Sequence, residues 1–158
     1  MEYKNAATYW IAALFVIGNI ALPQLCHLVP SGGPMLLPIY FFTLVAAYKY
    51  GWKVGVLTAV ASPLVNSALF AMPAPAVLPA ILTKSLLLAA AAGFAARKFR
   101  RVSLLLLLGV VLFYQVIGSA AEWALTGSLA AALQDFRIGI PGMLLQILGG
   151  YLFIKYLK

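Results

Sequence analysis

The chain has 158 residues, of which 65% are hydrophobic and only 9% are charged, with a formal net charge of +8. A soluble domain carries about 25% charged residues, so this supply excludes a soluble protein with an ordinary hydrated surface. The basic residues gather in short clusters at the ends of apolar runs, which favours charges that set membrane topology over nucleic-acid binding.

Six apolar runs follow one another along the chain. A helix needs about 20 residues to cross the hydrocarbon core of a membrane, and fewer where neighbouring helices shelter its end. The predicted spans are residues 6–22, 35–48, 54–71, 77–96, 102–123 and 138–156. Pro23 is expected to end the first span, and a short interfacial helix is expected over residues 129–133. The fold class is therefore an all-α membrane protein, built as a single bundle of six transmembrane helices.

The basic residues mark one side of this predicted bundle. They precede the first span and follow the second, fourth and sixth spans, at Lys4, Lys49, Lys53, Arg97, Lys98, Arg100, Arg101, Lys155 and Lys158. The alternate gaps hold no lysine or arginine until Arg137, at the edge of the last one. This alternation is the positive-inside pattern and predicts that both termini are cytoplasmic. No gap is long enough for a nucleotide-binding domain, and no Walker phosphate loop occurs.

Polar side chains within the spans fall at one depth, toward the external side. They are Asn19, Asn66, Lys84, Tyr114, Gln115, Glu122 and Gln146, with Trp123 beside Glu122 and Arg137 at the outer mouth of the last span. Because polar groups inside a membrane are costly, each is a candidate functional residue. Their common depth predicts an outward-facing pocket for a small molecule.

Lys84 carries the most weight, since a lysine within a span costs about 2.5–3.5 kcal/mol on insertion scales unless it is paired or hydrated. It could form a structural ion pair with Glu122 or extend to the interface, or it could receive a carboxylate, phosphate or carbonyl of a ligand. The two roles can coexist. Asn66 and Gln115 are equally suited to inter-helix hydrogen bonds and to ligand recognition. Trp123 suits either an interface anchor or a stacking face.

The first external loop, residues 24–34, contains Cys26 and His27. These adjacent residues lack the spacing of a metal site, and no second ligand cluster accompanies them, so no metal is expected. His27 is instead a candidate ligand contact in a covering loop. Gly32 and Gly33 would allow this loop to move as a lid, although an ordinary inter-helix turn is the slightly favoured interpretation.

Small residues recur every four positions in two stretches, at Ala47, Gly51, Gly55, Ala59 and Pro63, and at Ser85, Ala89 and Gly93. Such spacing lets helices approach closely, which predicts packing inside the bundle. The alternative is a flat outer face for another membrane protein.

The predicted architecture resembles the substrate-binding S components of energy-coupling factor (ECF) vitamin transporters. The most family-like stretch runs from Leu37-Pro-Ile-Tyr40 through Tyr50-Gly-Trp-Lys-Val-Gly-Val56 to Ser62-Pro-Leu-Val-Asn66. The resemblance implies high-affinity capture of a vitamin or cofactor precursor at a bacterial or archaeal cytoplasmic membrane. It also implies a transmembrane coupling subunit and two ATPase subunits as partners, with membrane lipid around the chain. No catalytic residue, enzymatic activity or cofactor is expected.

These residues predict a ligand with acidic or carbonyl groups, which would suit Lys84, Arg137 and the amides. Two other functions remain open. A self-sufficient small secondary transporter would need a coupling acid near mid-membrane, and Glu122 is peripheral for that role. A membrane scaffold protein would need no polar pocket.

Overall fold

The computed structural model describes residue 3 and residues 5–157, and within them every regular element is a helix. The long helices are α1 (Ala6–Cys26), α4 (Trp52–Phe70), α5 (Leu78–Phe99) and α6 (Leu104–Thr126). These four are long and apolar enough to cross a membrane. The expected all-α fold is confirmed, and the four helices have the length and composition of a multi-pass membrane protein. Lys4 and Lys158, two members of the basic pattern, lie outside the described residues.

Helix α1 continues through Pro23 to Cys26, so the expectation that Pro23 ends it is wrong. A proline inside a helix leaves the carbonyl of the residue four positions earlier, here Asn19, without its usual donor. The side chain of Asn66 supplies that donor, with Nδ2 2.8 Å from the Asn19 carbonyl oxygen. The neighbouring helix α4 therefore supports the last turn of α1.

Residues 35–48, expected as one span, are divided at Leu37. Helix α2 (Gly32–Leu36) ends there, and the 3-10 turn η1 (Pro38–Tyr40) leads into α3 (Phe41–Tyr50). Leu37 has a φ of 47°, and Pro38 after it disfavours the right-handed helical conformation at that position. The ten residues of α3 are about 15 Å long at 1.5 Å per residue, about half the thickness of a membrane.

The last apolar run also differs from a single plain helix. Residues 129–138 form α7 (Leu129–Ala132), at the position expected for an interfacial helix, and α8 (Gln134–Ile138). The run predicted as residues 138–156 begins two residues later, with Pro141 in the first turn of α9 (Ile140–Leu144). The π-helical turn η2 (Leu145–Gly149) and α10 (Gly150–Tyr156) complete it.

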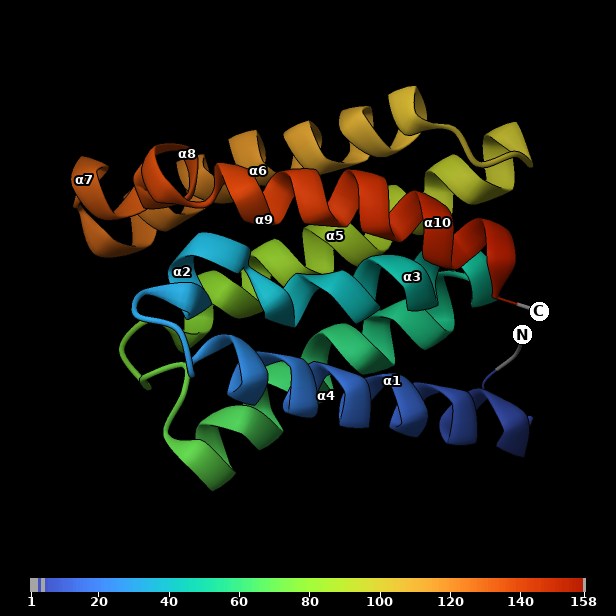
Figure 1. The fold of residues 1–158 in the computed structure, drawn as a ribbon, viewed down its shortest axis with the longest axis horizontal. Helices are drawn as coiled ribbons and strands as arrows, with labels where there is room; N and C mark the ends of the chain where they lie inside the picture. Colours follow the sequence, from blue (N-terminus) through green and yellow to red (C-terminus); the bar gives the residue numbers. More distant parts are fainter. Residues whose placement is uncertain (1–2, 4, 158) are drawn as a thin grey trace.

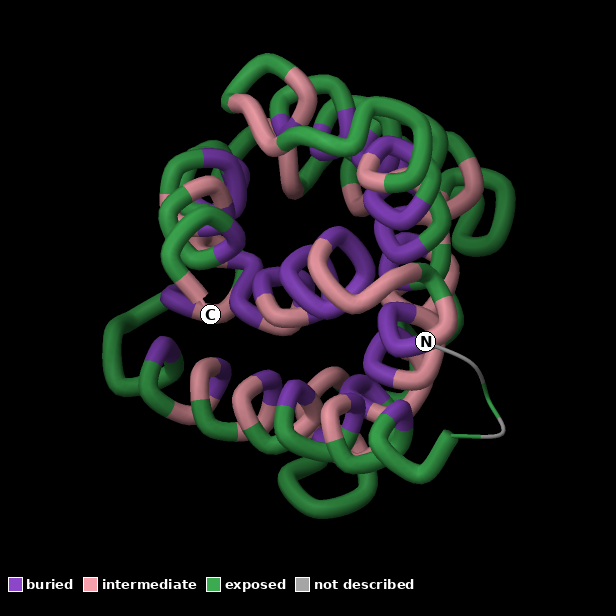
Figure 2. The backbone as a smooth tube through the Cα atoms, turned by 90° about the vertical axis from the view of Figure 1, so that its right-hand side faces the viewer, coloured by how far each residue is buried: buried purple, intermediate pink, exposed green. Residues whose placement is uncertain are grey.

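Helix α3 occupies the centre of the bundle, where Leu44, Val45, Ala46 and Ala47 are completely buried. Figure 2 shows the buried backbone concentrated around this centre and the exposed backbone outside it. Apart from Gly51, which is half-buried between α3 and α4, the small residues lie inside the bundle, as the first interpretation predicted. A Cβ on Gly55 would lie 2.4 Å from the Cβ of Ala47, which shows how closely α4 approaches α3.

The outer surface of the bundle is apolar. Large exposed side chains include Trp10, Leu14 and Ile17 on α1, and Leu105 and Val116 on α6. Exposing this apolar surface to water would cost free energy, whereas contact with lipid tails would not.

The two ends of the bundle differ in charge. α1 and α4 begin, and α3, α5 and α10 end, on the right of Figure 1, which we call the basic end. It carries the described basic residues Lys49, Lys53, Arg97, Lys98, Arg100, Arg101 and Lys155. Contacts cross this end, since Tyr48 donates a hydrogen bond of 2.6 Å to the carbonyl of Arg101. Helices α2, α7 and α8 lie at the opposite end.

Candidate functional site

A cavity of about 340 Å³ lies at the end of the bundle opposite the basic end. The end of α1, the α2–η1 segment, the α4–α5 connection and the α7–α8 segment all contribute to it. Most of its wall is apolar, including Pro23, Leu37, Ile39, Met72, Val77 and Ile81. The polar and charged side chains that line it are His27, Tyr40, Lys84, Glu122, Gln134 and Asp135. A mostly apolar cavity with a few convergent polar groups is typical of a small-molecule site.

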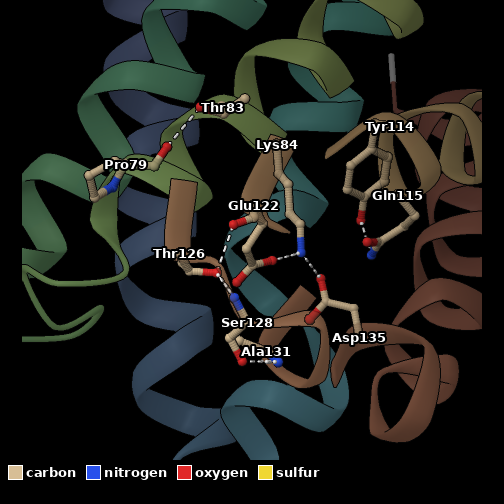
Figure 3. Close-up of polar contacts among 10 residues, drawn as sticks. All are labelled: Pro79, Thr83, Lys84, Tyr114, Gln115, Glu122, Thr126, Ser128, Ala131 and Asp135. Carbon is tan, nitrogen blue, oxygen red and sulfur yellow. Dashed lines mark hydrogen bonds and ion pairs between the residues drawn. The ribbon is translucent and has the colours of Figure 1, made fainter. Parts of the chain in front are cut away.

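Lys84 holds two carboxylates in this cavity (Figure 3). Its Nζ lies 2.6 Å from Oε2 of Glu122 on α6 and 2.8 Å from Oδ2 of Asp135 on α8. The Lys84 side chain is 4% exposed, and each carboxylate side chain is 13% exposed. The ion pair between Lys84 and Glu122, weighed from the sequence, is therefore present. We call these three residues the ion triad.

Gly118 makes room for the lysine. A Cβ at this position of α6 would lie 2.5 Å from Cγ of Lys84. The stem of Lys84 therefore packs directly on the backbone of α6, and this contact directs the ammonium toward the cavity end of the bundle. A larger residue at position 118 would displace the lysine stem.

Asp135 is the site residue that sequence reasoning missed. It lies in the segment 124–136, expected as an external connection, and α7 and α8 bring it back over the bundle to Lys84. The sequence holds one signal for it, because the chain contains only three acidic residues and Asp135 is one of them.

Tyr114, Gln115 and Gln146 are brought together, but they do not line the cavity. The Tyr114 hydroxyl donates a hydrogen bond of 2.8 Å to Oε1 of Gln146, in the π-helical turn, and accepts one of 3.0 Å from Nε2 of Gln115. All three side chains are completely buried. The ring of Tyr114 packs against Tyr40, with 5.4 Å between centroids, so this network supports a wall of the cavity.

Asn19 and Asn66 form a second buried network between α1, α3 and α4. Nδ2 of Asn19 donates to the hydroxyls of Thr43 and Ser62, each at 3.1 Å, and its Oδ1 accepts from the backbone N–H of Phe42 at 3.2 Å. Neither asparagine lines the cavity. Their contacts match the inter-helix alternative proposed for Asn66.

The remaining candidates divide between the cavity and the surface. His27 lines the cavity, and its Nδ1 lies 2.6 Å from the carbonyl oxygen of Pro23. A Cβ on Gly33 would lie 2.6 Å from Nε2 of His27, so this glycine lets α2 close over the ring. Trp123 is 53% exposed and does not line the cavity. Arg137 borders an adjoining, more open hollow beside α7 and α8, which shares Ala131 and Gln134 with the cavity.

No group of three metal-binding side chains occurs among the residues that the structure describes. No protein-family model, curated protein or solved structure matches the chain. The geometry of the cavity and the charge pattern of the bundle therefore carry the functional argument.

Proposed function

We propose that the chain is a membrane-embedded binding subunit that captures a small molecule from outside the cell. In this proposal the apolar segments cross the membrane six times and the basic end faces the cytoplasm. The four long apolar helices and the gathering of basic residues at one end support this orientation. The short helix α3 would lie within the thickness of the membrane but inside the protein, where neighbouring helices rather than lipid surround it.

The observation that carries the proposal is the cavity with the ion triad in its wall. Ionisable side chains at membrane depth are costly, and here three of them meet in one place. A scaffold protein would gain nothing from such a cavity. The triad instead provides fixed charges at an otherwise apolar wall, which is the combination that orients a bound molecule.

The proposed physiological role is that of an S component in an ECF-type vitamin transporter. It rests on the sequence resemblance, together with a cavity that opens at the end opposite the basic residues. The chain would bind the vitamin or cofactor precursor without chemical conversion. A separate coupling subunit with two ATPases would supply the energy, in a bacterial or archaeal cytoplasmic membrane.

Purification tests this role directly. The tagged chain is extracted from its native membranes in mild detergent, and co-purified small molecules and proteins are both identified by mass spectrometry. We expect one metabolite near equimolar amount, together with an integral membrane subunit and two ATPases. A preparation free of any metabolite would contradict the binding role, and a metabolite without ATPases would contradict the ECF role alone.

A self-sufficient carrier is the second candidate, and one observation favours it. Glu122 and Asp135 are two carboxylates within reach of the same cavity, and protonation of one of them could couple transport to a proton gradient. The purified chain in vesicles separates the two candidates. A carrier would move protons on addition of the co-purified metabolite, whereas a binding subunit alone would not.

A further inference from the structure

The net charge of the cavity wall is negative, whereas Lys84 alone would make it positive. The wall contains one lysine and two carboxylates, and both carboxylates contact that lysine. The ammonium charge is therefore already compensated, and one negative charge remains. Arg137, the other cation expected near the ligand, does not line the cavity and borders an adjoining hollow that shares Ala131 and Gln134 with it.

The free carboxylate oxygens in this wall are acceptors. Each carboxylate approaches Lys84 most closely through one oxygen, and Oε1 of Glu122 and Oδ1 of Asp135 receive no hydrogen bond from any described residue. Nδ1 of His27 faces the carbonyl of Pro23, an acceptor, so Nδ1 carries the proton of the neutral ring. This leaves Nε2 of His27 as a third acceptor. Gln134 and Tyr40, which also line the cavity, can donate as well as accept hydrogen bonds, but an anionic ligand would find no uncompensated cation in the wall.

On the basis of the proposed binding function, we infer that the ligand is a small organic cation. It carries one positive charge on a group with N–H donors, such as a protonated amine or an amidinium, and has no negative charge. Such a ligand brings the net charge of the wall to zero and donates to the free carboxylate oxygens, whereas an anion would add to a buried excess of negative charge. The buried Tyr40 also lines the cavity, and aromatic side chains attract cations.

The size of the cavity sets a second condition. Its volume of about 340 Å³ is near the lower limit for small-molecule sites. The ligand is therefore of single-ring or two-ring size, with the charged group at the triad and an apolar body against Leu37, Ile39 and Ile81.

Three probes of nearly identical shape test the sign of the charge. Benzamidine, benzamide and benzoate present a cationic, a neutral and an anionic planar group on the same ring. Binding to the purified full chain is measured at millimolar concentrations and neutral pH by saturation-transfer NMR. We expect benzamidine to bind about tenfold or more tightly than the other two. Equal or tighter binding of benzoate would overturn the inference.

Charge variants extend the test. Glu122→Gln and Asp135→Asn each leave Lys84 one partner, and each should weaken benzamidine binding by about tenfold. Lys98→Gln, a charge change at the basic end, should leave it unaltered. Unchanged benzamidine binding in either folded carboxylate variant would overturn the inference, so one folded variant is enough for the test.

The co-purified metabolite separates this inference from the proposed function. A cationic metabolite supports both, even if all three probes bind too weakly to detect. An anionic or uncharged metabolite overturns the inference but leaves the binding function in place. If neither metabolite nor probe binds, the proposed binding function itself fails.

Discussion

Lys84 shares its charge between two carboxylates, so the loss of one acid and the loss of both have different consequences. With one acid left, the lysine keeps a partner within 2.8 Å. With neither, a lysine that is only 3% exposed is left without a counter-charge. Breaking a buried ion pair by removing its partner costs about 3–5 kcal/mol, because the remaining charge is uncompensated.

We therefore predict a non-additive pair of variants. Glu122→Gln and Asp135→Asn should each lower the free energy of unfolding by about 1 kcal/mol or less, and the double variant by about 3–5 kcal/mol. Unfolding in mixed micelles measures all three values. A double variant equal to the sum of the single variants would show that Lys84 does not depend on the two acids jointly.

Asn19 is the residue on which the packing of α1 most depends. Its side chain bonds Thr43, Ser62 and the backbone of Phe42. Asn19→Ala should lower the free energy of unfolding by about 1–3 kcal/mol, since it leaves buried partners unsatisfied. Ile17→Ala, two residues away and on the exposed face, is the matched control and should change little. Equal effects of the two substitutions would contradict the role of the Asn19 side chain in holding α1 against its neighbours.

At the scale of elements, the close packing of α3 against α4 depends on the absence of a side chain at Gly55. A Cβ on Gly55 would approach Cβ of Ala47 to 2.4 Å and its Cα to 2.7 Å, so backbone as well as side chain would have to move. Gly55→Ala should therefore cost about 1–3 kcal/mol by overpacking. Gly109→Ala on α6 meets nothing within 4 Å and should be neutral or stabilising, because alanine favours the helix. Thermal unfolding of both variants in detergent measures the difference, and a neutral Gly55→Ala would contradict the close contact.

The sequence was sufficient for the elements whose physics is local. The long helices α4, α5 and α6 lie within three residues of the predicted spans, because apolar length determines them. The prediction that Pro23 ends α1 was wrong because the hydrogen-bond donor that compensates for the proline, the side chain of Asn66, comes from another helix. The break at Leu37 could have been suspected from Pro38, but its left-handed backbone could not be derived from composition.

The site was predictable only in part for the same reason. The cost of a charge at membrane depth drew attention to Lys84, and its ion pair with Glu122 was one of the alternatives that the sequence left open. Asp135 reaches Lys84 through the folding of α7 and α8, which no local periodicity encodes. The common depth of the polar residues predicted one shared pocket, whereas Asn19, Asn66, Tyr114, Gln115 and Gln146 form networks outside the cavity.

At the scale of the whole molecule, the proposed orientation in the membrane rests on the basic end. Cys26 is the only cysteine, so Cys26→Ala gives a background for single reporters. In intact cells, an impermeant maleimide should label Ser128→Cys, before α7, and should label Tyr156→Cys, near the end of α10, only after permeabilisation. The reverse pattern would place the cavity on the cytoplasmic side and contradict the proposed capture from outside.

Two adjacent alanines on α7 provide the most direct test of the cavity. Ala131 lines both the cavity and the adjoining hollow near Arg137, whereas Ala130 borders the hollow but not the cavity. Mass spectrometry of small molecules released on denaturation is compared between the original chain, Ala131→Trp and Ala130→Trp. We predict that the original chain and Ala130→Trp release the same metabolite in similar amounts, while Ala131→Trp is folded and empty. Release of that metabolite from folded Ala131→Trp at the original level would contradict binding in this cavity.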